Sequence, residues 1–257
     1  MTDITITDFD LSQIDERRRN GSAPVILVIG SRGKGKSTIA RAIMRSLRSI
    51  PMGNIFSSTE TCSPFYSENV PSLFIYSTLD LRALKTVVDE QKKTEKRRSV
   101  FILIDDMMYD PLFLRTPIVK GIFLNGRHWG ITLLLTTQYA IDVPPALRGN
   151  VDYVFLMREN NLQTCAKLHK NFGGIFPTTA VFNQAMRACT VDFGSLVLDF
   201  VNDRAFRFRV DMEEEKEPFR MFADSVWRYA EQHTCRSEEE HDIVTQDSSF
   251  RIMMPKK

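Results

Sequence analysis

The sequence has few cysteines, no long apolar run and little excess charge of either sign. The four cysteines are widely separated and form no C-x-x-C pair: Cys62, Cys165, Cys189 and Cys235. This spacing fits neither a disulfide scaffold nor a zinc ribbon, so we expect a reducing, intracellular environment. No apolar run approaches the roughly 20 residues that span a bilayer, and the chain starts without an apolar signal segment. We therefore expect no membrane insertion.

The formal net charge of the 257 residues is only +2. Whole-molecule steering towards nucleic acid is therefore weak, and contact with a polyanion must come from a local patch. The length fits one large domain or a domain with an appendage, and the 43% of hydrophobic residues are enough to fill a sizeable core.

Apolar runs alternate with helical patterns along most of the chain. Six runs have the uninterrupted, β-rich composition of buried parallel strands, at 25–29, 54–58, 73–76, 100–104, 131–137 and 153–157. Helical patterns lie between them at about 36–49, 79–96, 116–126 and 160–170. This alternation predicts an α/β fold, a three-layer sandwich around a mostly parallel central sheet.

The two ends of the chain differ from this pattern. Residues 194–210 indicate two short strands around an Asn-Asp turn. From 211 to 240 there are ten acidic and four basic side chains. We expect a surface helix at about 217–232 and then a disordered tail. The first twenty or so residues are predicted to form an arm.

The stretch GSRGKGKST, residues 30–38, matches the phosphate-loop pattern G-x-x-x-x-G-K-[ST] between a strand and a helix. Glycines let backbone N–H groups wrap around phosphate oxygens, and the following helix N-terminus adds its positive dipole end. Lys36 would reach the β- and γ-phosphates, and Ser37 would bind Mg²⁺. We therefore predict ATP and Mg²⁺ as cofactors, held by Gly30, Ser31, Arg32, Gly33, Lys34, Gly35, Lys36, Ser37 and Thr38.

The run VFILIDD places two acids at the end of an apolar strand. Asp105 would bind the Mg²⁺ shell and Asp106 would polarise the attacking water; adjacent acids repel each other unless a cation or a function offsets the cost. The alternative is a turn-forming Asp pair. At least one strand separates the phosphate-loop strand from this one. That order resembles the additional-strand, RecA-like division of P-loop proteins, whose members are mostly hydrolases and motors. Their second acid is usually Glu, so Glu60 is a reserve candidate.

Gln138 follows the strand 131–137 and could hydrogen-bond both the γ-phosphate and the water, although an ordinary strand end is the alternative. Arg127 precedes the same strand, and Arg148 and Arg158 flank the next one. An arginine supplied by a neighbouring subunit can stabilise charge on the transferring phosphoryl group. For each arginine a solvated surface charge is the alternative, and which of them acts in trans is left open.

Four segments, GSRGKGKST, VFILIDD, NGRHWGITLLLTTQ and PPALRGNVDYVFLMRE, resemble in order and spacing the genome-packaging ATPases of nucleocytoplasmic large DNA viruses. These belong to the FtsK–HerA superfamily, and the resemblance covers about residues 20–210. It implies a ring-forming ATPase that drives double-stranded DNA into a capsid, with capsid or other packaging proteins as partners. It also implies a location in the viral factory of the host cytoplasm, or association with the virion.

The sequence divides on this basis into an N-terminal arm (1–22), a P-loop ATPase domain (23–210) and an acidic C-terminal helix with a tail (211–257). A basic run at 85–99 could neutralise DNA phosphates, although a charge run is usually a solvated helix face. Three other functions stay open: a nucleotide or nucleoside kinase, a nucleotide-dependent scaffold without turnover, and a helicase-type unwinder.

Overall fold

A computed structural model describes residues 5–60, 63–94, 98–107, 112–138 and 143–239 of the chain. The described residues do not include Cys62, Lys96, Arg97 or the part of the predicted tail from residue 240 onward.

Within these ranges, nine strands form one sheet in the order β1-β9-β8-β7-β2-β6-β5-β3-β4. The strands are β1 (Thr7–Asp8), β2 (Val25–Ile29), β3 (Met52–Ser57), β4 (Ile75–Tyr76), β5 (Val100–Asp105), β6 (Ile131–Thr137), β7 (Tyr153–Leu156), β8 (Ser195–Asp199) and β9 (Arg204–Phe208). All neighbouring strands are parallel except the pairs β7–β8 and β8–β9. The predicted strand pair in 194–210 is therefore confirmed as an antiparallel hairpin.

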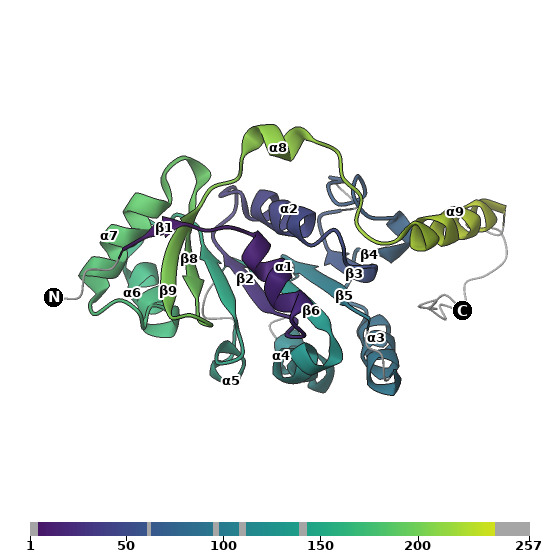
Figure 1. Cartoon of the computed structure of the whole chain (residues 1–257), viewed down its shortest axis with the longest axis horizontal. Coiled ribbons are helices and arrows are strands. Elements are labelled where there is room, and N and C mark those ends of the chain that lie inside the picture. The colour runs from purple at the N-terminus through teal and green to yellow at the C-terminus, as the bar shows by residue number, and fades with distance from the viewer. Residues whose placement is uncertain (1–4, 61–62, 95–97, 108–111, 139–142, 240–257) are drawn as a thin grey trace.

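Helices cover both faces of the sheet. They are α1 (Ser12–Arg19), α2 (Lys36–Ser46), α3 (Leu81–Lys93), α4 (Pro117–Trp129), α5 (Pro145–Arg148), α6 (Leu162–Phe172), α7 (Thr179–Cys189), α8 (Met212–Lys216) and α9 (Asp224–Glu239), with short turns η1 (Ser72–Phe74), η2 (Phe113–Arg115) and η3 (Val191–Phe193). α2 and α8 lie on one side of the sheet and α3, α4 and α5 on the other, while α6 and α7 stand beside β8 and β9 (Figure 1). The predicted α/β three-layer fold is confirmed.

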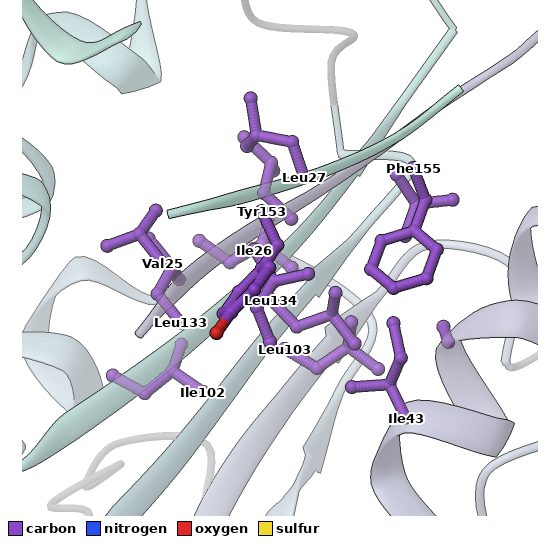
Figure 2. Close-up of a cluster of buried hydrophobic side chains, with 14 of the residues drawn as sticks. Val25, Ile26, Leu27, Ile43, Ile102, Leu103, Leu133, Leu134, Tyr153 and Phe155 are labelled. Carbon is purple, nitrogen blue, oxygen red and sulfur yellow. The ribbon is translucent and has the colours of Figure 1, made fainter. Parts of the chain in front are cut away.

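The centre of the sheet is apolar on both faces. Every residue of β2, β5 and β6 is buried. Figure 2 shows side chains of these strands together with Tyr153 and Phe155 of β7 and Ile43 of α2. A strand covered by helices on both faces has apolar residues at every position, because both of its faces are buried. Such strands therefore form continuous apolar runs in the sequence, and their positions could be predicted. Because these strands are parallel, their carboxyl ends meet at one edge of the sheet.

One predicted helix has different bounds. The surface helix expected at about 217–232 is found as α9, which starts only at Asp224 and continues to Glu239, into the segment predicted as a tail; residues 217–223, after α8 ends at Lys216, are not helical. Pro218 cannot continue a helix. The N–H groups of Met221 and Ala223 donate to the carbonyl oxygens of Asn69 and Pro51 at 2.8 and 2.9 Å. Backbone pairing with distant residues therefore replaces helical pairing in this segment.

Both end segments pack on the same core as the sheet. Ile14 of α1 is completely buried, and Arg17 pairs with Asp152 at 2.6 Å. On the C-terminal side Phe219 and Met221 are buried in the main hydrophobic cluster. The division at residues 22 and 210 stays a prediction, and these contacts show what holds the two segments in place. No helix in the described ranges has both the length and the apolar content needed to span a membrane.

Candidate nucleotide-binding site

The phosphate loop connects the carboxyl end of β2 to α2. Gly33 and Gly35 have φ angles of 75° and 88°, in the left-handed region that glycine enters without steric cost. A Cβ on Gly30 would lie 2.4 Å from the Cβ of Met157, so only glycine fits against the end of β7. α2 begins at Lys36, and its first backbone N–H groups have no intrahelical acceptor. The loop and the helix end together form a cradle for anionic oxygens.

Lys36 lies over this loop rather than in solvent. Its side chain is buried, and its Nζ atom lies 3.5 Å from the carbonyl oxygen of Ser31. A lysine in this position carries its charge next to the open loop, as contact with the β- and γ-phosphates requires.

Asp105, the last residue of β5, is buried and accepts two hydrogen bonds. Thr136 of β6 donates to Oδ1 at 2.5 Å, and the Tyr66 hydroxyl donates to Oδ2 at 2.9 Å. Burial raises the pKa of Asp105 above its ordinary value, and the charge of Asp106 adds to this, while the two hydrogen bonds and the charge of Lys36 oppose it. The acid is thus fixed in place beside the phosphate loop.

Tyr66 is a site residue that no sequence motif indicated. Its hydroxyl contacts Ser37 as well as Asp105, so it connects the two predicted metal ligands. Burial raises the pKa of Tyr66 far above its usual value, which keeps the hydroxyl protonated and able to donate. The segment is anchored by the Glu60 carboxylate, which accepts the N–H groups of Phe65, Tyr66 and Ser67. In this structure the reserve acid Glu60 therefore organises the loop that carries Tyr66.

Asp106 points to a different partner. Nε2 of Gln138 donates to both of its carboxylate oxygens, at 3.0 and 2.8 Å. The φ angle of Asp106 is 51°, so the chain turns sharply after β5 and the two neighbouring carboxylates diverge. Thr136 connects the pair, because it accepts the N–H of Asp106 at 3.0 Å and donates to Asp105. Since β6 lies between β2 and β5, Gln138 is placed between the phosphate loop and the acids.

The side chains present fit a magnesium ion. Mg²⁺ prefers hard oxygen ligands and is usually held by one or two protein oxygens together with the phosphates of a nucleotide. The Ser37 hydroxyl and the Asp105 carboxylate are such ligands, and both contact the same tyrosine hydroxyl. Ser37 and Asp105 are therefore the residues that would hold the ion.

The predicted trans-acting arginines lie away from the phosphate loop. Arg127, in the last turn of α4, precedes β6, and Arg148, at the end of α5, precedes β7. Both are therefore at the amino edge of the parallel strands, opposite the site. Arg127 is exposed, and its Nε lies 3.2 Å from Nε2 of His128. Arg158 instead follows the carboxyl end of β7 and lines a hollow together with Lys34 of the loop.

The basic run at 85–99 is partly neutralised where it is described. Lys85 pairs with Asp89 at 2.5 Å, and Lys93 pairs with Glu90 at 3.1 Å. Lys92 lies over the ring of Trp129, with Nζ 4.6 Å from the ring centroid. A DNA-contacting role for this run stays a prediction.

Asp105→Asn is expected to raise the unfolding temperature of the nucleotide-free protein near neutral pH. Folding raises the pKa of this carboxyl from the ordinary 3.8. Its contribution to stability is therefore present below that value and is lost as the pH rises through the folded-state pKa. The advantage of Asn should shrink as the pH falls towards about 4. Thermal unfolding in a chelator across this pH range, with the exposed Asp203→Asn as control, measures the effect. A lower unfolding temperature for Asp105→Asn at every pH would contradict it.

Two proteins of large DNA viruses are similar to this chain over most of its length. Uncharacterized protein 075L of Invertebrate iridescent virus 6 is 35% identical over 203 residues, which cover 76% of this chain and 79% of that protein. The chain belongs to this family of large-DNA-virus proteins. A second relative, uncharacterized protein 088R of Invertebrate iridescent virus 3, is 33% identical over 230 residues, covering 83% of this chain and 88% of that protein. No protein-family profile matches the chain.

Solved structures show which fold this viral family has. The genome packaging NTPase B204 of Sulfolobus turreted icosahedral virus 2, in complex with AMPPCP, has a TM-score of 0.56 and 16% identity, covering 74% of this chain and 99% of B204. The pCW3 conjugation coupling protein TcpA has a TM-score of 0.59 and 15% identity, covering 87% of this chain and 74% of TcpA. This chain therefore has the fold of these two proteins, as the predicted P-loop NTPase fold requires.

Proposed function

We propose that this protein is an ATP-hydrolysing motor that translocates double-stranded DNA and packages a viral genome into its capsid. The observation that carries the proposal is the arrangement at one edge of the sheet. Asp105 and Ser37 share the Tyr66 hydroxyl, and Asp106 is paired with Gln138 next to the phosphate loop. This arrangement supports a role for Asp105 at a metal ion and for Asp106 at a water, the two roles that hydrolysis requires.

Each side chain then has a separate task. The loop N–H groups and Lys36 bind the phosphates. Ser37 and Asp105 would hold Mg²⁺, which when bound would neutralise charge on the phosphate oxygens. Asp106 accepts the proton of the attacking water. The backbone carbonyl of Thr137, the residue before Gln138, accepts the Gly30 N–H at 3.1 Å. The backbone of Gln138 therefore lies beside the phosphate loop, and its side chain can respond to a γ-phosphate bound there.

DNA as the cargo is supported by the relatives. The family consists of proteins from large DNA viruses, B204 is called a genome packaging NTPase, and TcpA is a conjugation coupling protein. The proposed motor works as a ring of copies of this chain, in which Arg127 or Arg148 faces a neighbouring copy's nucleotide. Capsid or other packaging proteins are its proposed partners, in the host cytoplasm at the site of virus assembly or in the virion.

The test is the ATPase rate with and without long double-stranded DNA, for the wild type and for Lys36→Ala. We expect DNA to stimulate phosphate release by the wild type, and Lys36→Ala to show neither basal nor stimulated activity, because the phosphates lose their buried cation. A rate that does not respond to DNA would contradict the motor. Transfer of phosphate to a nucleoside would indicate a kinase, and ATP-induced assembly without phosphate release would indicate a scaffold.

A further inference from the structure

A hollow of about 820 Å³ adjoins the phosphate loop and is not used by the phosphate chemistry. One wall is formed by Gly33, Gly35 and Thr38 of the loop and of α2. The other walls come from the turn η3 and from the segment that leaves β9 and leads into α8. Figure 1 shows this segment rising beside α2 to reach α8, which lies above α2 in the view. Ion pairing of Arg41 with Glu215 at 2.5 Å fixes α8 to α2, so the hollow is preformed.

Phe193 in η3 is the most prominent side chain of this hollow. Its ring is not part of the core, because 72% of its surface is exposed. Asp192 and Phe193 both have left-handed backbones, with φ angles of 49° and 59°. Bulky side chains avoid this region, and such strained residues gather at ligand sites. Packing does not account for an exposed aromatic ring held in this conformation.

The Phe193 ring lies next to the phosphate loop. A Cβ on Gly35 would lie 3.8 Å from Cδ1 of Phe193, so the ring is one side chain away from the loop that precedes Lys36. In a nucleotide the ribose links the base to the α-phosphate, so a nucleotide with its phosphates on this loop has its base on a surface that borders the loop. Met212, which is 59% exposed, supplies a second apolar surface of the same hollow. Aromatic rings and thioethers are suitable partners for the flat face of a base.

We infer that Phe193 is the stacking surface for the nucleobase, with Met212 as a further apolar wall. The inference rests on the proposed function in one respect, which is that the base is the adenine of ATP. Stacking on an aromatic ring tolerates any base, so stacking alone would not select adenine. Asp192 and Arg209, an ion pair 3.8 Å apart at this hollow, would form the hydrogen bonds to the base that select it.

The test compares ATP with inorganic tripolyphosphate, which can use the phosphate loop but has no base. Calorimetry with Mg²⁺ is performed on the wild type, Phe193→Ala and Val191→Ala. We expect Phe193→Ala to weaken ATP binding roughly 5- to 100-fold and to leave tripolyphosphate binding unchanged. Val191 is a matched control, because it is 49% exposed on the same turn but does not line this hollow. Val191→Ala should bind both compounds like the wild type.

A second variant gives a readout other than affinity. Phe193→Trp keeps an aromatic face, so ATP binding should persist and should change the fluorescence of the new tryptophan, while tripolyphosphate should not. The chain has only two other tryptophans, and neither lines this hollow. The measured quantity is the fluorescence change of Phe193→Trp on ligand binding minus the change of the wild type under the same conditions.

Three outcomes would overturn the inference. If Phe193→Ala binds ATP with the same affinity as the wild type, Phe193 does not stack on the base, although the phosphate-loop site itself would still be supported. Weakened binding of both ATP and tripolyphosphate, together with a lower unfolding temperature, would mean that Phe193 supports the fold. Failure of the wild type to bind either compound would instead overturn the phosphate-loop site, and the proposed function with it.

Discussion

Asp106→Asn is expected to lower the rate of phosphate release about 10²- to 10⁴-fold, the range for removal of a positioned general base. ATP binding should change little, because Lys36, Ser37 and Asp105 are untouched. Asn tolerates the left-handed backbone that Asp106 adopts at φ 51°, so the turn after β5 should be kept. Phosphate release at saturating ATP and calorimetric ATP affinity measure the two effects separately.

Asp203→Asn is the matched control for this variant. Asp203 also has a left-handed backbone, with φ 52°, but it lies in the turn between β8 and β9, away from the phosphate loop. Its replacement removes the same charge from the same backbone conformation and should leave turnover unchanged. Near wild-type hydrolysis by Asp106→Asn would show that another group activates the water, and would contradict the role assigned to Asp106.

Gly53→Ala should destabilise the protein by about 3 kcal/mol or more, at the upper end of overpacking effects. A Cβ on Gly53 in β3 would lie 2.2 Å from the carbonyl oxygen of Phe101 in β5, and a backbone atom cannot move aside as a side chain can. The two strands would have to separate. Because Ser57 of β3 is in register with Asp105, the shift would also reach the site. Thermal unfolding should show a decrease of roughly 6–12 °C.

Gly149→Ala is the corresponding control. Gly149 has φ −67° and no atom within 4 Å of an added Cβ, so alanine is compatible with its backbone and surroundings. This change should raise stability by about 0.4–1 kcal/mol, because it restricts the unfolded chain. If Gly53→Ala unfolds at the same temperature as the wild type, then β3 and β5 are not packed as closely as described.

Some parts of the site were predictable because their cause is local. The phosphate loop follows from glycine conformations and a lysine at fixed spacing, and β2 and β6 have the bounds that their apolar runs predict. Asp105 and Gln138 were identified because each one ends or follows such a run. Helix ends were less accurate: α3 begins only after Asp80, whose side chain accepts N–H groups of the first turn.

Other parts depend on residues that are distant in the chain. Tyr66 lies in a polar segment with no motif, and it reaches Asp105 only because Glu60 gathers the N–H groups of its loop. No motif marks Phe193, and only the tertiary structure places it on the surface beside Gly35. The break between α8 and α9 arises from backbone hydrogen bonds to Asn69 and Pro51.

By itself, the sequence determined the phosphate loop, the acid pair and the alternation of strands and helices, because these follow from local backbone preferences and from burial on both faces of a sheet. Only the tertiary structure decided which side chains meet. The insertion of β6 between β2 and β5 places Thr136 and Gln138 at both acids, and the left-handed turn at Asp106 directs its carboxylate away from Asp105. Such contacts depend on strand order and on long-range packing, which no short stretch of sequence encodes.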